Sequence, residues 1–153
     1  MLRALIADDL PQNLYMLEVL LKTNGFEVSK ASDGAEALKI AHQEPPSLII
    51  SDILMPGMDG FNLCKAWKAD PDLSHIPFVF YTATYTDPRD EKLALSLGAD
   101  RFLVKPMEVD SFLTAIQEVM DQSKKDESAV PLKDAPKDEY FYKEYNEALI
   151  RKL

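Results

Sequence analysis

Short apolar runs alternate with amphipathic stretches along most of the chain, and this alternation restricts the fold more than any other feature of the sequence. The apolar runs occupy residues 2–7, 26–29, 48–52, 77–82 and 101–105. The stretches with helical spacing occupy residues 11–24, 34–43, 61–69, 88–97 and 108–121. Strands that are separated by helices are joined by crossover connections, so the sequence predicts a parallel sheet with helices on both faces.

The winding of such a sheet determines where its functional edge lies. Right-handed crossovers with helices on both faces force the winding to reverse at one point. One common order for five strands is 2-1-3-4-5, in which the reversal lies between the first and third strands and ligands bind at their carboxyl ends. The expected fold class is therefore α/β: a flavodoxin-like (βα)5 doubly wound sandwich, with a parallel sheet in the order 2-1-3-4-5 and a C-terminal helical extension.

Acidic side chains stand where the first and third strands end. Asp8 and Asp9 follow the first run directly, and Asp52 ends the third. Because these two strands are neighbours in the expected sheet, the three carboxylates are predicted to converge. The fourth and fifth runs end at Thr82 and Lys105, which the same topology brings to this edge.

The chemistry of this set points to phosphate. Two like charges about 4 Å apart near a protein surface cost roughly 4 kcal/mol, and a divalent cation relieves this repulsion. Ligands that are all oxygen select a hard ion such as Mg²⁺, which also binds phosphate oxygens. Asp52 can act as a nucleophile, because a carboxylate can form an acyl phosphate. Lys105 would offset charge on the transferring group, and the Thr82 hydroxyl would hydrogen-bond the product.

The motifs around these residues match a known family. They are Asp8-Asp9, Asp52 with Met55-Pro56-Gly57-Met58-Asp59-Gly60, Tyr81-Thr82-Ala83, and Gly98-Ala99-Asp100 leading to Lys105-Pro106. Together and in this order, they make residues 1–122 resemble the receiver domain of two-component response regulators. The resemblance implies a signalling module rather than an enzyme, one that accepts a phosphoryl group and assists its own phosphorylation and dephosphorylation.

The resemblance assigns the phosphoryl and metal sites. It implies that Asp52 is the phosphoacceptor and that Mg²⁺ is bound by Asp8, Asp9 and Asp52, with Asp9 a more direct ligand than Asp8. Leu54 would supply a backbone carbonyl to the metal. The Leu54 side chain has no polar group to position a hydrolytic water, so we expect slow loss of the phosphoryl group.

The resemblance also assigns the residues and partners that respond to phosphorylation. Thr82 is expected to be the switch hydroxyl, Lys105 the lysine that contacts phosphate, and Phe102 the aromatic side chain that swings inward on activation. The Lys105–Pro106 bond is expected to be cis, as is typical of the family. The implied partners are a histidine kinase or phosphotransfer domain and a second copy of the chain. The second copy would bind through the fourth helix, fifth strand and fifth helix, or through the C-terminal helix.

Charge and composition narrow the function classes. The net charge of −9 disfavours direct binding to nucleic acid, because phosphate neutralisation needs clustered Lys and Arg. The lone Cys64 cannot form an internal disulfide and fits a reducing compartment. No apolar run approaches the ~18 residues of a membrane span, and we expect no signal peptide because the first strand begins at once. The sequence therefore predicts a cytoplasmic protein without membrane contact.

The end of the chain contains two further segments. Residues 123–137 are polar and contain prolines, which predicts a linker after a receiver domain at residues 1–122. Residues 138–153 regain helical spacing. The residues that share one face of this helix are Tyr142, Tyr145, Leu149 and Leu153. We expect the helix to pack on the receiver or to form an interface, and to begin the downstream region of a longer sensor or regulator protein.

Other functions remain open on the sequence alone. An aspartate-nucleophile phosphatase has the pattern Asp-x-Asp after the first strand. In this chain Asp8 and Asp9 are adjacent, and Leu54 takes the place of an acid two residues after Asp52. A flavodoxin-like flavin binder would need a phosphate loop rich in hydroxyls and glycine after the first strand, where this chain is acidic. A pseudo-receiver would work through protein contacts without phosphorylation.

Overall fold

The computed structural model describes residues 2–83, 87–125 and 138–152 of the chain. Its strands are β1 Leu2–Ala7, β2 Phe26–Ala31, β3 Leu48–Ser51, β4 Phe78–Thr82 and β5 Arg101–Val104. Its helices are α1 Pro11–Thr23, α2 Gly34–Gln43, α3 Gly60–Ala69, α4 Pro88–Ser96, α5 Val109–Lys125 and α6 Asp138–Lys152. All neighbouring strands pair in parallel in the order β2-β1-β3-β4-β5, which confirms the predicted fold class and sheet order.

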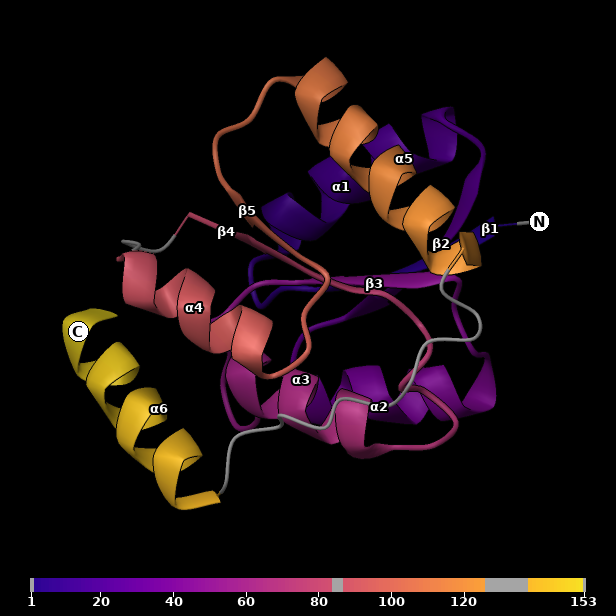
Figure 1. Cartoon of the computed structure of the whole chain (residues 1–153). Coiled ribbons are helices and arrows are strands. Elements are labelled where there is room, and N and C mark those ends of the chain that lie inside the picture. Colours follow the sequence, from indigo (N-terminus) through magenta and orange to yellow (C-terminus); the bar gives the residue numbers. More distant parts are fainter. Residues whose placement is uncertain (1, 84–86, 126–137, 153) are drawn as a thin grey trace.

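The sheet lies between two layers of helices (Figure 1). Helices α1 and α5 cover one face, and α2, α3 and α4 cover the other. Successive strand residues point to opposite faces, so Leu5 and Ile49 enter the core under α2 and α3, whereas Ile6 and Ile50 enter the core under α1 and α5. Strands β1, β3 and β4 are buried along most of their length and are mainly apolar, whereas the edge strands β2 and β5 are more exposed.

Capping side chains set the beginnings of several helices. The Asp33 carboxylate accepts a hydrogen bond from the Glu36 N–H at the start of α2. Asp59 caps α3 and Asp87 caps α4 in the same way. Gly25 follows α1 with φ +89°, a left-handed conformation that glycine adopts without strain.

Two boundaries differ by more than one residue from those expected. Strand β2 continues to Ala31, two residues beyond the expected end, because it pairs with β1 along its whole length. Helix α5 continues to Lys125, so the first residues of the expected linker are helical. Residues 126–137 lie outside the described residues, and the division into a receiver domain, a linker and a C-terminal segment stays a prediction.

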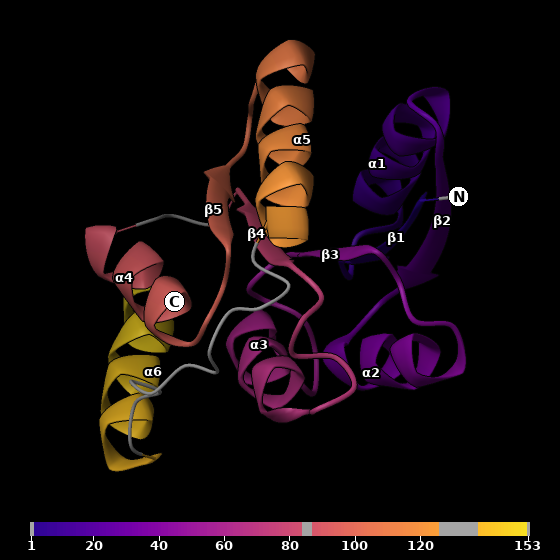
Figure 2. The ribbon, with the colours of Figure 1, turned by 45° about the vertical axis from the view of Figure 1, so that its right-hand side comes forward.

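Helix α6 lies outside the sandwich and alongside α4 in two views (Figures 1 and 2). It confirms the predicted C-terminal helix. Its Ala148 is fully buried, and Tyr145 packs against the core cluster on the α2–α4 side of the sheet. The helix therefore packs on its own preceding domain, which was one of the two arrangements expected for it. The side chains of Tyr142 and Leu153 lie outside the described residues.

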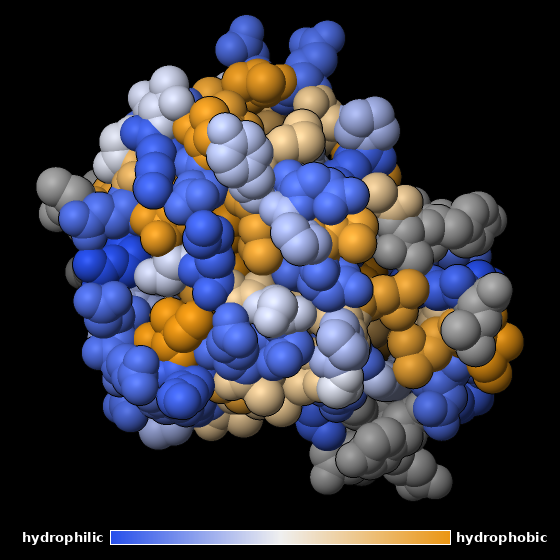
Figure 3. Space-filling view, turned by 180° about the vertical axis from the view of Figure 1, so that it is seen from behind, coloured by the Kyte–Doolittle hydropathy of each residue, from blue (hydrophilic) through white to orange (hydrophobic). Residues whose placement is uncertain are grey.

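On the rear of the molecule, hydrophobic side chains form several small groups among hydrophilic ones, and one of these groups lies near the top, where α1 lies (Figure 3). Met16 and Val19 are among the exposed apolar residues of this helix. Among the helices of the described ranges, none has the length and apolar character that crossing a membrane would require.

Candidate functional site

The carboxyl ends of β1 and β3 bring Asp8 and Asp52 together. Ala7 pairs with Ser51 in the parallel ladder, and the Asp52 N–H continues it with a 3.0 Å hydrogen bond to the Ala7 carbonyl. Each aspartate is the first residue beyond its strand. The topological switch point between these neighbouring strands therefore places both carboxylates at one edge, as the sequence predicted.

Lys105 bridges the two carboxylates. Its Nζ lies 3.1 Å from Oδ2 of Asp8 and 3.7 Å from Oδ2 of Asp52. The ammonium group also lies 5.2 Å from the centroid of the Tyr81 ring. The following bond, Lys105–Pro106, is cis, which confirms that prediction. One cation from the end of β5 thus partly neutralises two acidic side chains from the ends of β1 and β3.

Asp8 is buried, with 1% of its surface exposed, and is held by several donors. Its Oδ1 accepts a hydrogen bond from the Leu10 N–H at 2.9 Å, and its Oδ2 accepts one from the Asn13 amide at 3.2 Å. Sequence reasoning missed Asn13. The signal was its place in the first turn of the helix that follows Asp8, from which a short amide side chain can reach back to the strand end.

Asp52 is held by a backbone donor and a hydroxyl. Its Oδ1 accepts a 2.6 Å hydrogen bond from the Ile53 N–H, and its carboxyl group is also hydrogen-bonded to Thr82. Burial raises the pKa of Asp52, because the charged form loses hydration. The hydrogen bond with Thr82 and the charge of Lys105 act in the opposite direction. The structure therefore places Thr82, Lys105 and Asp52 together, as the sequence predicted.

Asp9 differs from Asp8 in its exposure, because Asp8 is buried and Asp9 is exposed. Nowhere in the described ranges are three acidic, histidine or cysteine side chains grouped closely enough to hold a metal ion together. Asp8 and Asp52 are brought together by Lys105 in this structure, and a shared metal site that includes Asp9 stays a prediction.

The carboxylates of Asp8 and Asp52 fit a hard cation. Asp8 and Asp52 offer only carboxylate oxygens, and Mg²⁺ binds through one or two carboxylates while keeping several waters. The Lys105 ammonium between the two carboxylates shows that positive charge is stabilised at this place. The Leu54 side chain packs against the core, and the metal-binding role of its carbonyl stays a prediction.

The loop after Asp52 is packed tightly against its surroundings. The Gly60 N–H donates a 2.7 Å hydrogen bond to the Ile53 carbonyl, and a Cβ on Gly60 would lie 2.2 Å from the Asp52 carbonyl oxygen. On the other side of the loop, the Gly34 N–H donates a 3.0 Å hydrogen bond to the Met58 carbonyl. Only glycine permits these approaches, so the Asp-Gly pairs that contain Gly34 and Gly60 reflect close packing beside Asp52. Gly57 of the Pro-Gly pair has open space around it and instead adopts a positive φ of 68°.

Comparison with known proteins identifies the family. Residues 4–117 match the family model described as the response regulator receiver domain. The chain belongs to this family. The response regulator PleD of Caulobacter vibrioides is 43% identical to it over 107 residues, which cover 69% of this chain and 23% of PleD. Protein PilH of Pseudomonas aeruginosa is 34% identical over 120 residues, or 78% of this chain and 98% of PilH.

Solved structures agree with this assignment. The signal receiver domain of a signal transduction histidine kinase from Syntrophus aciditrophicus superposes with a TM-score of 0.75 at 33% identity, over 87% of this chain and 99% of that chain. The chemotaxis protein CheY4 of Vibrio cholerae superposes with a TM-score of 0.73 at 34% identity, over 78% and 98% of the two chains. The receiver spans less than a quarter of PleD but nearly all of PilH.

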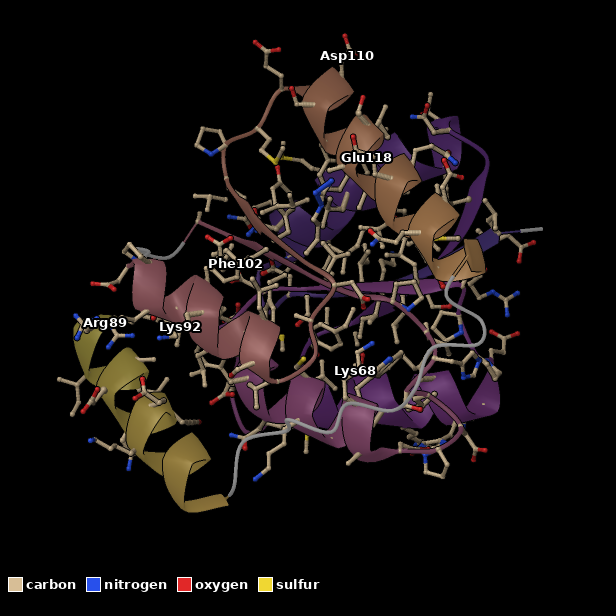
Figure 4. All side chains as sticks on the ribbon, in the orientation of Figure 1. Lys68, Arg89, Lys92, Phe102, Asp110 and Glu118 are labelled. Carbon is tan, nitrogen blue, oxygen red and sulfur yellow. The ribbon has the colours of Figure 1, made fainter. Side chains whose placement is uncertain are left out.

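Phe102 of the receiver packs inward. Its ring centroid lies 6.0 Å from that of Phe80, and it joins the core cluster on the α4 side of the sheet. Figure 4 shows it near the β4–β5 edge of the sheet. The side chain therefore occupies an inward position in this structure, and its movement on activation stays a prediction.

A second group of charged residues, which sequence reasoning missed, joins α6 to the receiver. The Tyr145 hydroxyl hydrogen-bonds to the Asp59 carboxylate. Asp90 of α4 is fully buried and binds two cations of α6, Arg151 at 2.8 Å and Lys152 at 2.7 Å. The helical spacing of the tail was a signal that α6 packs on something, but it did not identify the partner surface.

Proposed function

We propose that this receiver accepts a phosphoryl group on Asp52 from a histidine kinase or phosphotransfer domain, and that the modification switches a protein-interaction surface. One observation carries the proposal. Asp52 stands at the switch point of the sheet, with the Thr82 hydroxyl hydrogen-bonded to its carboxyl group and the Lys105 ammonium 3.7 Å away. A nucleophile, a cation and a hydroxyl are thus collected where a phosphoryl group would be formed.

The proposed step is an in-line displacement at phosphorus. A carboxylate oxygen of Asp52 forms a bond to the phosphorus of a phosphohistidine while the P–N bond breaks. The bonding pair returns to the ring nitrogen, and a neutral imidazole leaves because its other nitrogen carries the proton. Lys105 offsets negative charge on the phosphoryl oxygens, and the Thr82 hydroxyl donates a hydrogen bond to one of them.

A divalent cation fits the same place. Bound Mg²⁺ would be held by Asp8, Asp9, Asp52 and the backbone carbonyl of Leu54, and would supply positive charge at the phosphoryl oxygens. The product carries about 1.5 to 2 negative charges at neutral pH, enough to reorient Thr82 and Lys105 toward it. Phe102 and α4 lie next to these groups and would transmit the change to the surface.

The test is intact mass after incubation of the full chain with Mg²⁺ and acetyl phosphate. We expect addition of one phosphoryl group to the wild type, and none to Asp52→Asn or in the presence of a chelator. Asp110→Asn is the matched control, because it makes the same change on the exposed outer end of α5, where Figure 4 shows Asp110. No uptake by the wild type, or uptake by Asp52→Asn, would contradict the proposal and favour a pseudo-receiver.

The side chain two residues after the phosphoacceptor should set the lifetime of the product. Leu54 is partly buried against the core and has no polar group to position a water. We therefore expect slow loss of the phosphoryl group from the wild type and faster loss from Leu54→Asn, whose amide can hydrogen-bond a water. The measurement is the decay of the phosphorylated mass after removal of the donor. A wild-type half-life of seconds would contradict this prediction.

The partners and setting of the receiver belong to the same proposal. We propose a cytoplasmic signalling protein in which this receiver is part of a longer sensor or regulator, without direct nucleic-acid contact. We expect the receiver to act on its output by forming a dimer, through the surface of α4, β5 and α5 or through α6. Cross-linking and size-exclusion chromatography of the phosphorylated and unphosphorylated chain would test for a change in oligomeric state.

A further inference from the structure

Helix α6 is held to the receiver at two separate points. Tyr145 hydrogen-bonds to Asp59 at the start of α3, whereas Arg151 and Lys152 pair with Asp90 in the first turn of α4. Seven residues of helix, or about 10 Å, separate the two points. A single rigid element therefore spans the beginnings of two helices, and its fit depends on how far apart they lie.

The first point connects directly to the phosphoacceptor. Asp59 uses Oδ1 to cap α3, where it accepts the Asn62 N–H at 3.0 Å, and uses Oδ2 for Tyr145. Its neighbour Gly60 lies directly against the backbone of Asp52, with no room for a Cβ. A displacement of the Asp52 backbone would therefore move the anchor of Tyr145.

A row of aromatic rings provides a second connection to the same point. The Tyr145 ring centroid lies 6.2 Å from that of Phe61, and the Phe61 centroid lies 5.8 Å from that of Phe80. Phe80 precedes Thr82 by two residues on β4. Phe61 and Phe80 are buried in one core cluster and the partly buried Tyr145 packs against it, so a shift of one side chain has to be accommodated by its neighbours.

The second point follows Thr82 along the chain. Asp90 takes part in a capping box with Asp87, which comes five residues after Thr82 in the sequence. The Lys152 side chain is fully buried against Asp90, and Arg151 is 13% exposed. The anchor at Asp90 thus belongs to the helix that directly follows the strand carrying Thr82.

We propose that α6, through Tyr145, Ala148, Arg151 and Lys152, is an intramolecular latch that fits the unphosphorylated receiver and is released when Asp52 is phosphorylated. The inference rests on the proposed function. The carboxyl group of Asp52 is hydrogen-bonded to Thr82, so a phosphoryl group added to this carboxyl group changes the contact between the two side chains. This change alters the spacing between the loop that leads to Asp59 and the strand that leads to α4, and a rigid helix with an anchor on each side cannot follow both.

The coupling has to act in both directions. If phosphorylation weakens the binding of the latch, the bound latch weakens the binding of a phosphoryl group or its mimic by the same factor. Typical couplings of this kind are about 5- to 150-fold. The bound latch therefore restrains the receiver, and its release exposes the α4 surface around Asp90.

Binding of the latch is tested first, in the unphosphorylated full chain. The readout is amide hydrogen exchange of residues 143–152 by mass spectrometry, because a free helix of this length is marginal in water and exchanges quickly. We expect protection in the wild type, and exchange that is faster by about tenfold or more in Tyr145→Phe and in Asp90→Asn. Ile150→Ala and Glu91→Gln are the controls, since both residues are exposed and adjacent to the latch contacts. Exchange in the wild type and in the controls as fast as in Tyr145→Phe and Asp90→Asn would overturn the latch.

Coupling is tested next, with acetyl phosphate and Mg²⁺ as donor and with beryllium trifluoride and Mg²⁺ as an equilibrium mimic. We expect faster exchange of residues 143–152 in the phosphorylated wild type but not in Asp52→Asn. We also expect Tyr145→Phe to bind the mimic more tightly than the wild type, whereas Ile150→Ala binds it equally. A phosphorylated chain with unchanged or stronger protection, or equal affinities, would overturn the coupling alone. If the wild type neither takes up a phosphoryl group nor binds the mimic, the proposed function is overturned, and the coupling with it.

Discussion

Asp8 and Asp90 are both buried aspartates paired with cations, but the balance of charge around them is opposite. Asp8 shares one cation, Lys105, with Asp52, and Asp9 adds a further carboxylate at the same strand end. Asp90 has two direct cationic partners, Arg151 and Lys152. The first region keeps an excess of negative charge that a further cation can relieve, whereas the second is already neutralised.

The difference separates a binding site from a structural clasp. At the strand ends, the unsatisfied carboxylate charge favours entry of a metal ion and of the phosphoryl group that it accompanies. At Asp90, the carboxylate charge is satisfied, and the excess charge is the positive charge of the cations. Within the part of the chain that the structure describes, the Arg151 Nε and Nη1 are buried without a hydrogen-bond partner. Such a clasp is costly to close, because buried donors lose their hydration, and is therefore well suited to reopen.

Removal of Lys105 should have the largest effect on stability. Lys105→Met leaves Asp8 buried beside Asp52 without the cation, and breaking a buried ion pair in this way costs about 3–5 kcal/mol. The measurement is urea unfolding in the presence of a chelator, followed by the fluorescence of the buried Trp67. Lys92→Met, on the exposed side of α4, is the matched control. A loss below about 1 kcal/mol would mean that Asp8 does not depend on Lys105.

Addition of Mg²⁺ should have the next largest effect, and should act on the first region alone. A ligand that binds only the folded state stabilises it by about 2.7 kcal/mol at a hundredfold excess over its Kd. We expect this gain in the wild type, a smaller gain at the same concentration in Asp9→Asn, and the full gain in the control Asp110→Asn. An unchanged unfolding midpoint in wild type would contradict a metal site at the strand ends. An undiminished gain in Asp9→Asn would remove Asp9 from it.

Loss of the Asp90 carboxylate should cost less than loss of Lys105. Asp90→Asn removes a helix-capping group, which costs about 1 kcal/mol, and also leaves Arg151 and Lys152 without their carboxylate. Separation of α6 from α4 lets both cations regain water. The total loss in unfolding free energy is therefore limited to the contribution of the cap plus the free energy of α6 binding. The measurement is urea unfolding with Glu91→Gln as control, which is expected within about 0.5 kcal/mol of the wild type.

A double-mutant cycle shows whether the loss in Asp90→Asn comes from the clasp. Lys152→Met should destabilise the wild type but have little further effect in Asp90→Asn, because the two side chains act as a pair. Additive effects of the two substitutions would show that Asp90 acts only as a cap of α4.

The sequence predicts the first region better than the second for a physical reason. Asp8, Asp52, Thr82 and Lys105 end four strands, and the parallel order alone brings strand ends together. Counting strand ends does not reveal that Asp8 is buried and its neighbour Asp9 is exposed. Tyr145 meets Asp59 across 86 positions of sequence, and helical spacing shows that a helix has an apolar face without showing where that face binds.

The change of the unfolding free energy with pH should be the smallest of these effects near neutral pH. It should still distinguish the two regions. Burial opposes ionisation of Asp90, but hydrogen bonds from Lys152 and Arg151 and from the Asp87 N–H leave its pKa below the ordinary value. A lowered folded-state pKa gives stability that is present above the unfolded-state pKa of about 3.9 and is lost as pH falls through the folded-state pKa. The difference in unfolding free energy between the wild type and Asp90→Asn should therefore stay constant from pH 7 to 5 and shrink only below about pH 4.

Asp52 should behave in the opposite way in metal-free buffer. Its pKa is raised by burial, so the folded protein takes up a proton at a higher pH than the unfolded chain does. The charged carboxylate therefore disfavours the folded state at neutral pH, and Asp52→Asn should be more stable than the wild type there. This advantage should decrease as pH falls through the folded-state pKa, at values above about 4, where the Asp90 difference is still constant. Urea unfolding of the wild type and both variants at each pH measures the two differences. Parallel curves for Asp52→Asn and Asp90→Asn would mean that the two regions do not differ in the way that their charges indicate.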